Sequence, residues 1–163
     1  MLTMGSTVFV PGVCGQEIFD FMLACTDTDY RRWWPGTHRR FHTLKRGPGE
    51  DHVGDIVLMD EYVGRRRVRL GGVVVEAVPG KKIVWQLREG VNLPVRLSLE
   101  LLDRDGGVAL RHTISAGFRG FGRILDPLLR LYFSPGFAAA MDHHANTEFA
   151  LLGERLIEAR PGP

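Results

Sequence analysis

The sequence predicts an α+β fold in which a meander of antiparallel strands is covered by one long C-terminal helix. Two patterns support this prediction. Between residues 37 and 118, apolar and polar side chains alternate with a period of two in several runs, which turns containing Gly or Pro separate. Between residues 135 and 159, apolar side chains recur every three or four positions, which is typical of an amphipathic helix.

The N-terminal part of the chain predicts one strand and two short helices. Thr7–Pro11 is rich in β-forming residues, and Pro11-Gly12 ends it. Residues 16–25 place apolar side chains at helical spacing. Cap-type residues then predict a second short helix over 27–33, which Pro35-Gly36 ends.

The middle of the chain predicts six further strands, so that the sheet has about seven in all. Gly71 and Gly72 indicate a β-bulge inside the longest of the six. Pro79–Lys82 is a strong turn signal that follows this strand. The six expected strands span residues 37–44, 53–63, 66–78, 83–89, 94–103 and 108–118.

The last third of the chain is expected to be helical. The leucine-rich segment 121–133 is interpreted either as a lid or as a segment that packs against the end of the sheet. Ser134-Pro135 resembles a helix cap followed by a proline at the first helical position, and the helix runs to Ala159. An antiparallel sheet with one apolar face needs a cover, which this helix provides. Its expected inner face comprises Phe137, Met141, Ala145, Phe149, Leu152 and Leu156.

The composition fits one domain that spans residues 1–163, and we expect the tail at 160–163 to be frayed. The chain is 44% hydrophobic and 25% charged, close to the average of globular proteins. No apolar run reaches the ~20 residues that cross a bilayer, and residues 1–10 lack the pattern of a signal peptide. We therefore expect a cytoplasmic protein without stable membrane insertion. Cys14 and Cys25 would lie roughly 16 Å apart along one helix, too far for a disulfide.

The net charge is only +2, but the basic residues are unevenly distributed and form two clusters. One lies between residues 31 and 46, where six basic residues occur with no acidic one. In the other, strand alternation would point the odd-numbered arginines to solvent and Val68 and Leu70 inward. We interpret both clusters as solvated faces of the sheet rather than as sites for phosphate, nucleic acid or an anionic membrane. The second cluster consists of Arg65, Arg66, Arg67 and Arg69.

Several stretches of the chain carry a resemblance to a known family. They are Thr-Val-Phe-Val-Pro-Gly at 7–12 with Glu17-Ile18-Phe19, Trp33-Trp34-Pro35-Gly36, Val53-Gly54-Asp55, the hairpin from Val78 to Trp85, and the closing helix. Together they resemble the START-related, polyketide-cyclase and birch-pollen-allergen superfamily (SRPBCC) over nearly the whole chain. The resemblance implies the helix-grip fold, a curved antiparallel sheet of about seven strands wrapped around a long C-terminal helix, with two short helices after the first strand. It also implies a deep, mostly apolar cavity, which in members of the superfamily binds lipids, sterols, plant hormones or polyketides.

Two side chains are candidates for catalysis. His112 shares an expected strand face with Val108 and Ile114, so its imidazole would point into the cavity. There it could hydrogen-bond a ligand or act as a general acid or base, and a core histidine with a protein partner is the alternative. Glu61 is the second candidate if its face of the strand points inward, but the face of Tyr62 has an equal claim.

His144 and Glu148 lie four residues apart on one face of the long helix. They are expected either to orient a polar group of a ligand or to face solvent. A metal site would find two ligands here, but no third is evident in the sequence, so we expect neither a metal nor another cofactor. His38 and His42 share a face of the strand 37–44 with Arg40, and the opposite face of Arg39, Phe41 and Thr43 has a comparable claim to point inward. Solvent exposure is the default expectation for both histidines.

The functional prediction favours binding of a hydrophobic or amphipathic small molecule, lipid- or polyketide-like, between the sheet and the helix. The alternative is a polyketide cyclase or dehydratase that uses cavity His and Glu residues as general acid and base, although the superfamily has no universal catalytic signature to carry over. A third hypothesis is a chaperone-like partner binder that uses the basic sheet face, and a homodimer is compatible with each. Phosphate-loop, Gly-x-Ser-x-Gly and Cys-x-x-Cys patterns are absent. The expected ligand-binding residues are Trp34, Met59, Trp85, Leu99, His112, Met141, His144 and Glu148.

Overall fold

The computed structural model describes residues 1–118 and 120–162, and it has the α+β architecture that the sequence predicts. Seven strands form one antiparallel sheet, and they are β1 (Leu2–Pro11), β2 (His38–Lys45), β3 (Ile56–Val63), β4 (Arg66–Val78), β5 (Lys82–Glu89), β6 (Val91–Arg104) and β7 (Gly107–Ala116). Their order across the sheet is β1-β7-β6-β5-β4-β3-β2. The N-terminal strand therefore joins the last strand of the meander, and β1 and β2 form the two edges.

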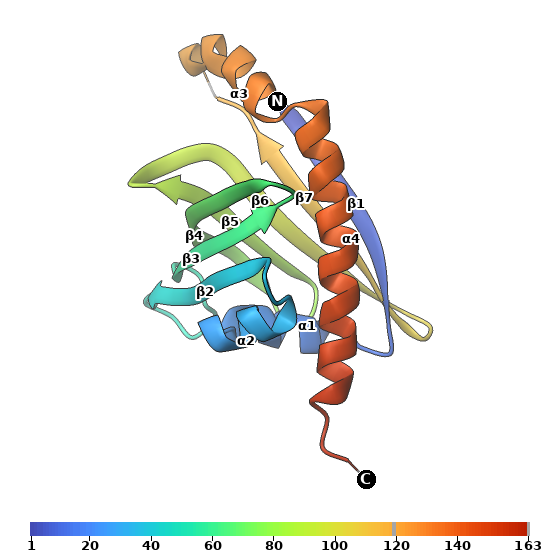
Figure 1. Ribbon diagram of the computed structural model, residues 1–163. Coiled ribbons are helices and arrows are strands. Elements are labelled where there is room, and N and C mark those ends of the chain that lie inside the picture. Colours follow the sequence, from blue (N-terminus) through green and yellow to red (C-terminus); the bar gives the residue numbers. More distant parts are fainter. Residues whose placement is uncertain (119, 163) are drawn as a thin grey trace.

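The helices lie at both ends of the sheet and along its inner side. They are α1 (Gly15–Ala24), α2 (Asp27–Trp33), the 3-10 helix η1 (Gly120–Leu125), α3 (Asp126–Tyr132) and α4 (Pro135–Glu158). Figure 1 shows the sheet curving beside α4, with α1 and α2 near one end of the molecule and α3 at the other. Ser134 Oγ accepts a hydrogen bond from the Phe137 N–H at 3.3 Å, so the predicted cap begins α4. The helix-grip arrangement expected from the sequence is confirmed.

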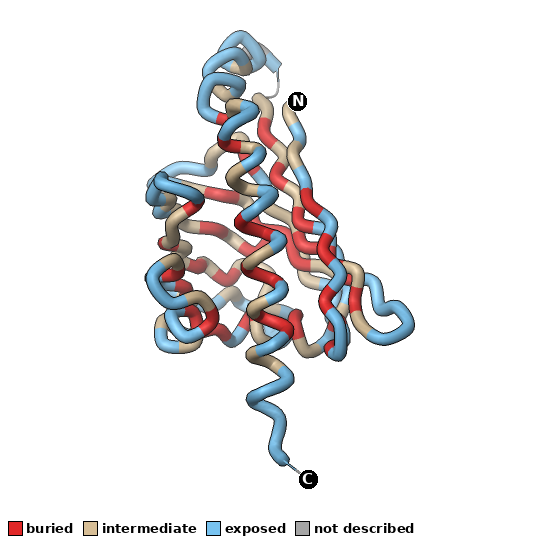
Figure 2. The backbone as a smooth tube through the Cα atoms, turned by 45° about the vertical axis from the view of Figure 1, so that its right-hand side comes forward, coloured by how far each residue is buried: buried red, intermediate tan, exposed pale blue. Residues whose placement is uncertain are grey.

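Helix α4 packs onto the sheet through the apolar face that its spacing predicts. Phe137, Ala145, Phe149 and Leu152 are buried, and the remaining two residues of the predicted face are half-buried. Figure 2 shows buried segments alternating with exposed ones along the helix. A Cβ atom at Gly153 would lie 2.5 Å from Val10 Cγ1, so the glycine lets α4 approach β1 closely. No described helix, α4 included, is long and apolar enough to span a membrane.

The prediction of a β-bulge at Gly71 and Gly72 is wrong, because both residues keep a regular register with β3. The irregularity in β4 falls instead between Val74 and Glu76, where the pairing with β5 shifts. Gly72 serves another purpose. A Cβ atom at Gly72 would lie 3.3 Å from the Cβ of Trp85, so the missing side chain makes room for the fully buried tryptophan.

Three strand starts also differ from the expectation by three residues or more. Strand β6 starts at Val91 rather than Pro94, because Val91 and Asn92 pair with Glu89 and Arg88 of β5. Strand β1 starts at Leu2 rather than Thr7, because its first residues pair with the end of β7. Strand β3 starts at Ile56 rather than Val53, because Asp55 organises the preceding loop. The Asp55 carboxylate accepts hydrogen bonds from the Gly47 N–H at 2.6 Å and from Arg46 Nη1 at 2.8 Å.

The basic cluster of β4 has the predicted alternation. Val68 and Leu70 face the interior, whereas Arg67 and Arg69 are exposed. Arg67 makes a bidentate ion pair with Asp60 of β3, through Nε at 2.8 Å and Nη2 at 2.7 Å. Part of the positive charge on this face is therefore neutralised by the neighbouring strand.

Candidate functional site

A cavity of about 250 Å³ lies between the sheet and α4. Its wall is mostly aliphatic and aromatic, and strands β3 to β7 contribute to it together with α3 and α4. A smaller chamber of about 40 Å³ lies deeper and shares part of this wall, namely Met59, Glu61, Leu97, His112 and Glu148. The ionisable residues that line the main cavity include Glu61, Glu89, His112, His144 and Glu148.

Most of the predicted ligand-binding residues line these two spaces. The main cavity is lined by Met59, His112, Met141, His144 and Glu148, and the deeper chamber by Trp85 and Leu99. The sequence left the inward face of the strand 53–63 open, and the structure shows that Met59 and Glu61 point inward.

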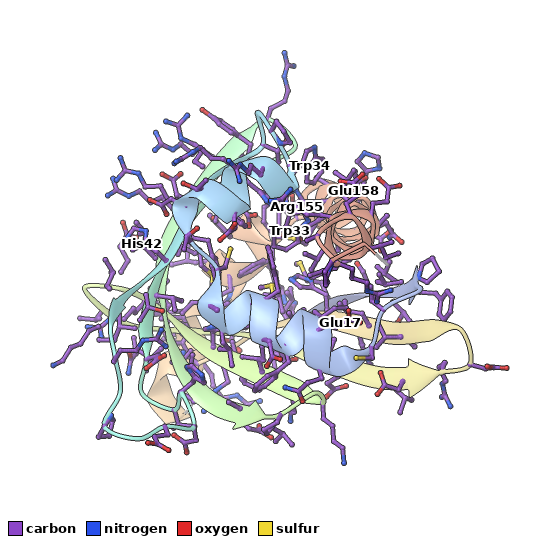
Figure 3. All side chains as sticks on the ribbon, turned by 90° about the horizontal axis from the view of Figure 1, so that it is seen from below. Glu17, Trp33, Trp34, His42, Arg155 and Glu158 are labelled. Carbon is purple, nitrogen blue, oxygen red and sulfur yellow. The ribbon has the colours of Figure 1, made fainter. Side chains whose placement is uncertain are left out.

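The two adjacent tryptophans differ in their surroundings. Trp33 is buried, and its indole N–H donates a hydrogen bond to the Glu148 carbonyl oxygen at 2.6 Å. Trp34 is not among the described residues that line either space, and its ring centroid lies 4.9 Å from that of His144. In Figure 3 both tryptophans lie between α2 and α4. Trp33 therefore holds α2 against α4, whereas Trp34, an expected ligand-binding residue, packs near His144 and does not line either space.

Four ionisable side chains meet at the cavity wall, and they are called the His–Glu cluster below: His38, Glu61, His144 and Glu148. One nitrogen or oxygen atom of each lies within 4.8 Å of the corresponding atoms of the other three. His144 Nε2 is 3.3 Å from Glu61 Oε2 and 3.7 Å from Glu148 Oε2. His38 Nε2 is 3.3 Å from Glu148 Oε1 and 3.6 Å from Glu61 Oε2. Each imidazole therefore faces both carboxylates.

Three separate elements supply the His–Glu cluster. His38 is the first residue of β2, and Glu61 lies in β3, where it pairs with His38 in the strand register. His144 and Glu148 lie one turn apart on α4, as their spacing predicts. The cluster thus depends on the packing of α4 over the β2–β3 edge of the sheet, and no local segment contains it.

The ring of His38 is held in one orientation. It stacks on the ring of Tyr30, with centroids 3.8 Å apart and planes 9° apart. Its Nδ1 lies 3.2 Å from the Tyr30 carbonyl oxygen, which can only accept a hydrogen bond, so Nδ1 carries a proton. Its Nε2 is buried and makes no hydrogen bond within the described part of the chain, although two carboxylates lie nearby.

Glu61 is stabilised in its charged form. Burial alone would raise the pKa of this carboxyl group, but its hydrogen bond with His144, the charges of His144 and His38, and the Tyr30 hydroxyl together hold the pKa below its usual range. The Tyr30 hydroxyl donates to Glu61 Oε2 at 2.5 Å. Burial and the Glu61 charge in turn raise the pKa of Tyr30, so its hydroxyl stays protonated.

The two cavity histidines are tuned in opposite directions. Burial would lower the pKa of His144, but its hydrogen bond with Glu61 and the charges of Glu148 and Glu61 outweigh it and raise the pKa. Burial lowers the pKa of His112, and the more distant charges of Glu148 and Glu61 do not compensate. The cavity therefore presents one imidazole that favours the cationic form and one that favours the neutral form.

The segment before α4 forms one end of the cavity. Leu129 and Tyr132 of α3 line it together with Phe133. The Arg66 guanidinium lies 4.9 Å from the centroid of the Tyr132 ring and 5.2 Å from that of Phe137. The sequence left open whether segment 121–133 is a lid or packs against the end of the sheet, and in the structure its residues Leu129, Tyr132 and Phe133 line the cavity.

Sequence reasoning missed His38 and Tyr30 as members of the site. His38 was expected to face solvent, and this is wrong, because only 2% of the residue is exposed. His42, which shares its strand, pairs instead with Asp27 through Nδ1 at 2.6 Å. One sequence feature could have indicated that this part of the chain faces the interior. Tyr30 and Trp33 are three residues apart, which puts two aromatic rings on one face of α2.

Comparisons with known proteins show the fold. No protein-family model and no curated protein matches the chain. Among solved structures, the chain is similar to Ara h 8.0201, with 10% identity, a TM-score of 0.61, and coverage of 96% of this chain and 98% of that chain. It is also similar to TTHA0849 from Thermus thermophilus, with 12% identity, a TM-score of 0.64, and coverage of 98% and 100%.

A third solved structure comes from a biosynthetic pathway. The di-domain ARO/CYC protein BexL from the BE-7585A pathway has 16% identity and a TM-score of 0.62, with 98% of this chain and 51% of that chain covered. Identities this low show the fold, and the three structures agree with the arrangement of sheet and C-terminal helix described above. The chain therefore has the helix-grip fold that these structures share.

Proposed function

We propose that the chain binds a hydrophobic or amphipathic small molecule, lipid- or polyketide-like, in the cavity between the sheet and α4. The observation that carries this proposal is a mostly apolar cavity of about 250 Å³ whose wall contains a few buried ionisable groups. A largely preformed apolar space with a small number of convergent polar groups is typical of small-molecule sites. The apolar body of the ligand would lie against residues such as Leu70, Leu97 and Ile114, and its polar group would meet the His–Glu cluster or His112.

The alternative function is that of a polyketide cyclase or dehydratase. The specific observation in its favour is the pair of tuned groups in one apolar cavity, an ionised Glu61 carboxylate and a neutral His112 imidazole. A carboxylate and a neutral imidazole can each accept a proton, and His144 in its cationic form can donate one. The similarity to the ARO/CYC protein BexL is compatible with this alternative.

Blocking the cavity tests the binding proposal. Met141 lines the cavity from α4, and Ala139 lies on the exposed side of the same helix. The fluorescent probe 1-anilinonaphthalene-8-sulfonate has an aromatic body and an anionic group, so it suits an apolar space with polar groups. We expect Met141→Trp to weaken its binding by at least about tenfold, which is ~1.4 kcal/mol, and the matched control Ala139→Trp to leave it unchanged.

Equal binding to both tryptophan variants would contradict the proposal, provided that their circular dichroism spectra match that of the wild type. The natural ligand is sought separately. Native mass spectrometry of the protein purified from its source would show whether a small molecule co-purifies. A co-purified molecule that the Met141→Trp variant no longer retains would identify the ligand of this cavity.

A further inference from the structure

We propose that the His–Glu cluster is a binding site for a divalent transition-metal ion, with zinc as the ion that best suits its donors. The ligands would be Nε2 of His38, Nε2 of His144 and one carboxylate oxygen each of Glu61 and Glu148. Imidazole nitrogens and carboxylate oxygens are common zinc ligands in proteins. This inference goes beyond the proposed function, because it concerns an inorganic ion and stands whether or not the cavity also holds a small molecule.

The spacing of the donor atoms supports the site. In a tetrahedral zinc site with bonds of about 2.0–2.2 Å, two donor atoms lie roughly 3.3–3.6 Å apart. Glu61 Oε2 lies 3.3 Å from His144 Nε2 and 3.6 Å from His38 Nε2, and Glu148 approaches His38 with Oε1 at 3.3 Å and His144 with Oε2 at 3.7 Å. The remaining separations stay within 4.8 Å. Small side-chain adjustments therefore suffice to bring four donors onto one ion.

The orientation of His38 is the second, independent observation. Its Nδ1–H faces the Tyr30 carbonyl oxygen at 3.2 Å, which leaves the lone pair of a neutral ring on Nε2. That Nε2 is buried, has no hydrogen-bond partner among the residues that the structure describes, and lies among the other donors of the cluster. Metal-binding histidines characteristically donate their second ring N–H to a backbone carbonyl or a carboxylate, which fixes the tautomer and the ring orientation.

The charges of the cluster give the third argument. The side chains of Glu61 and Glu148 are only 19% and 10% exposed, and buried carboxylates need compensation. A divalent cation with two carboxylates and two neutral imidazoles gives a neutral group. Protons on the imidazoles would also balance the carboxylates, so the experiment has to distinguish a metal ion from protons.

Titration of the metal-free protein with Zn²⁺ tests the site. Protein dialysed against EDTA and then against metal-free buffer should bind one equivalent of Zn²⁺ by calorimetry. Glu148→Gln keeps the shape of the side chain and removes its charge, and we expect it to weaken binding by at least about tenfold. His143→Gln is the matched control, because His143 is exposed on the neighbouring position of α4 and should leave the affinity unchanged.

Two further measurements keep the test decisive. His144→Gln should weaken binding as Glu148→Gln does, so the result does not depend on one variant that fails to fold. Co²⁺ added to the wild type should give the intense visible absorption bands of a four-coordinate ion. Absence of Zn²⁺ binding, a weak octahedral Co²⁺ spectrum, or equal affinities of the His144→Gln and His143→Gln variants would each overturn the proposal.

The metal experiment is separable from that of the proposed function. Binding of 1-anilinonaphthalene-8-sulfonate is measured on the same metal-free samples and depends on the apolar wall. Metal binding depends on the four donors of the cluster. If the protein binds the probe but no metal, only the proposed metal site is refuted. If it binds the metal but not the probe, only the proposed apolar ligand cavity is refuted.

Discussion

Tyr30 positions His38 and Glu61 at the same time. Its ring stacks on the His38 imidazole at 3.8 Å, its carbonyl oxygen faces His38 Nδ1 at 3.2 Å, and its hydroxyl donates to Glu61 at 2.5 Å. One residue of α2 therefore fixes a side chain on each of two neighbouring strands. The arrangement of the cavity wall depends on how this short helix docks against the edge of the sheet.

Removing only the hydroxyl of Tyr30 tests this dependence. Tyr30→Phe keeps the stacked ring but deprives the buried Glu61 carboxylate of one donor. Hydrogen bonds to charged groups contribute about 1.5–3 kcal/mol, so we expect the free energy of unfolding to fall by about that amount. Urea denaturation measures the loss. The matched control is Tyr62→Phe on the other face of β3, and a loss of similar size there would contradict the role given to Tyr30.

The second prediction concerns the apolar contact between α4 and the sheet. Phe149 is 2% exposed, and its ring lies 6.0 Å from that of Trp33 and 6.1 Å from that of His112. Replacing a buried phenylalanine by alanine typically costs ~3–5 kcal/mol, and we expect a loss in this range for Phe149→Ala. Ile157→Ala, at a 43% exposed position of the same helix, should cost much less. A loss below ~1 kcal/mol for Phe149→Ala would mean that α4 is not the main cover of the core.

The third prediction concerns acid stability and Asp55. Burial would raise the pKa of this carboxyl group, but hydrogen bonds from Gly47, His52 and Arg46 and the charge of Arg46 hold the pKa below its usual range. A lowered pKa means that the carboxylate stabilises the fold above its unfolded pKa of about 3.9, and that this stabilisation is lost as the pH falls through the lower, folded value. Asp55→Asn should therefore be less stable than the wild type at pH 6.

The pH dependence separates this role from simple packing. The difference in free energy of unfolding between the wild type and Asp55→Asn should shrink as the pH falls from 6 to about 3, because only the wild type loses an ionised group at this position. Urea denaturation at several pH values gives both curves. Parallel curves would show that the charge of Asp55 contributes nothing to the stability of the fold.

Much of the fold could be predicted because the spacing of apolar residues along the chain indicates which segments are helices and which are strands. The stripe from Phe137 to Leu152 and the inward residues of β5 to β7 follow from spacing alone, and the structure buries most of them. The start of β1 was missed because Met4, Gly5 and Ser6 lack β-forming character. Those residues become a strand by pairing with β7, which is an interaction between the two halves of the chain.

Only the part of the site whose residues are close together in the sequence could be predicted. His144 and Glu148 are one helical turn apart, so the sequence places them together. Alternation in a strand yields two faces but does not say which one points inward, and so Glu61 stayed ambiguous and His38 was assigned to solvent. The position of both was decided by Tyr30 and by the packing of α4, which join elements that are distant in sequence.

The fourth prediction concerns the second basic cluster, which begins in the turn before β4 and consists of Arg65, Arg66, Arg67 and Arg69. Arg67 is neutralised by Asp60, and its arginine neighbours are exposed to solvent, where charges are screened over ~8 Å at physiological salt. We expect only weak binding to duplex DNA or to anionic vesicles at ~0.15 M salt, measured by fluorescence anisotropy and by co-sedimentation. Salt-sensitive micromolar binding that disappears when the charges of Arg65, Arg67 and Arg69 are reversed would contradict this interpretation.

The fifth prediction separates a binding protein from an enzyme, and it concerns His112. The residue lies in β7, opposite Leu99 and Ser6 in the neighbouring strands, and it lines both the main cavity and the deeper chamber. Burial lowers its pKa, so its imidazole is neutral at physiological pH. In a wall that is otherwise mostly apolar, it can hydrogen-bond a ligand or exchange a proton with a substrate.

His112→Phe removes both abilities while nearly conserving the volume of the side chain. In a binding protein, the affinity for a ligand with a polar group should fall by about one hydrogen bond, ~0.5–1.5 kcal/mol, and the ligand should be recovered unchanged. In an enzyme, the same substitution should lower turnover by ~10²–10⁴-fold while the substrate still binds. The two functions therefore differ in which measured quantity moves.

The measurement uses the molecule that co-purifies with the wild type. Calorimetric titration of this molecule into both proteins gives the change in affinity, and mass spectrometry of the incubated mixtures gives the extent of conversion. Thermal unfolding of the two proteins serves as the control for the fold, because His112 is buried next to Phe149. If neither affinity nor conversion changes, His112 is a core histidine without a role in the site, because a side chain that contacts the ligand cannot lose its hydrogen bond without an effect on binding or reaction.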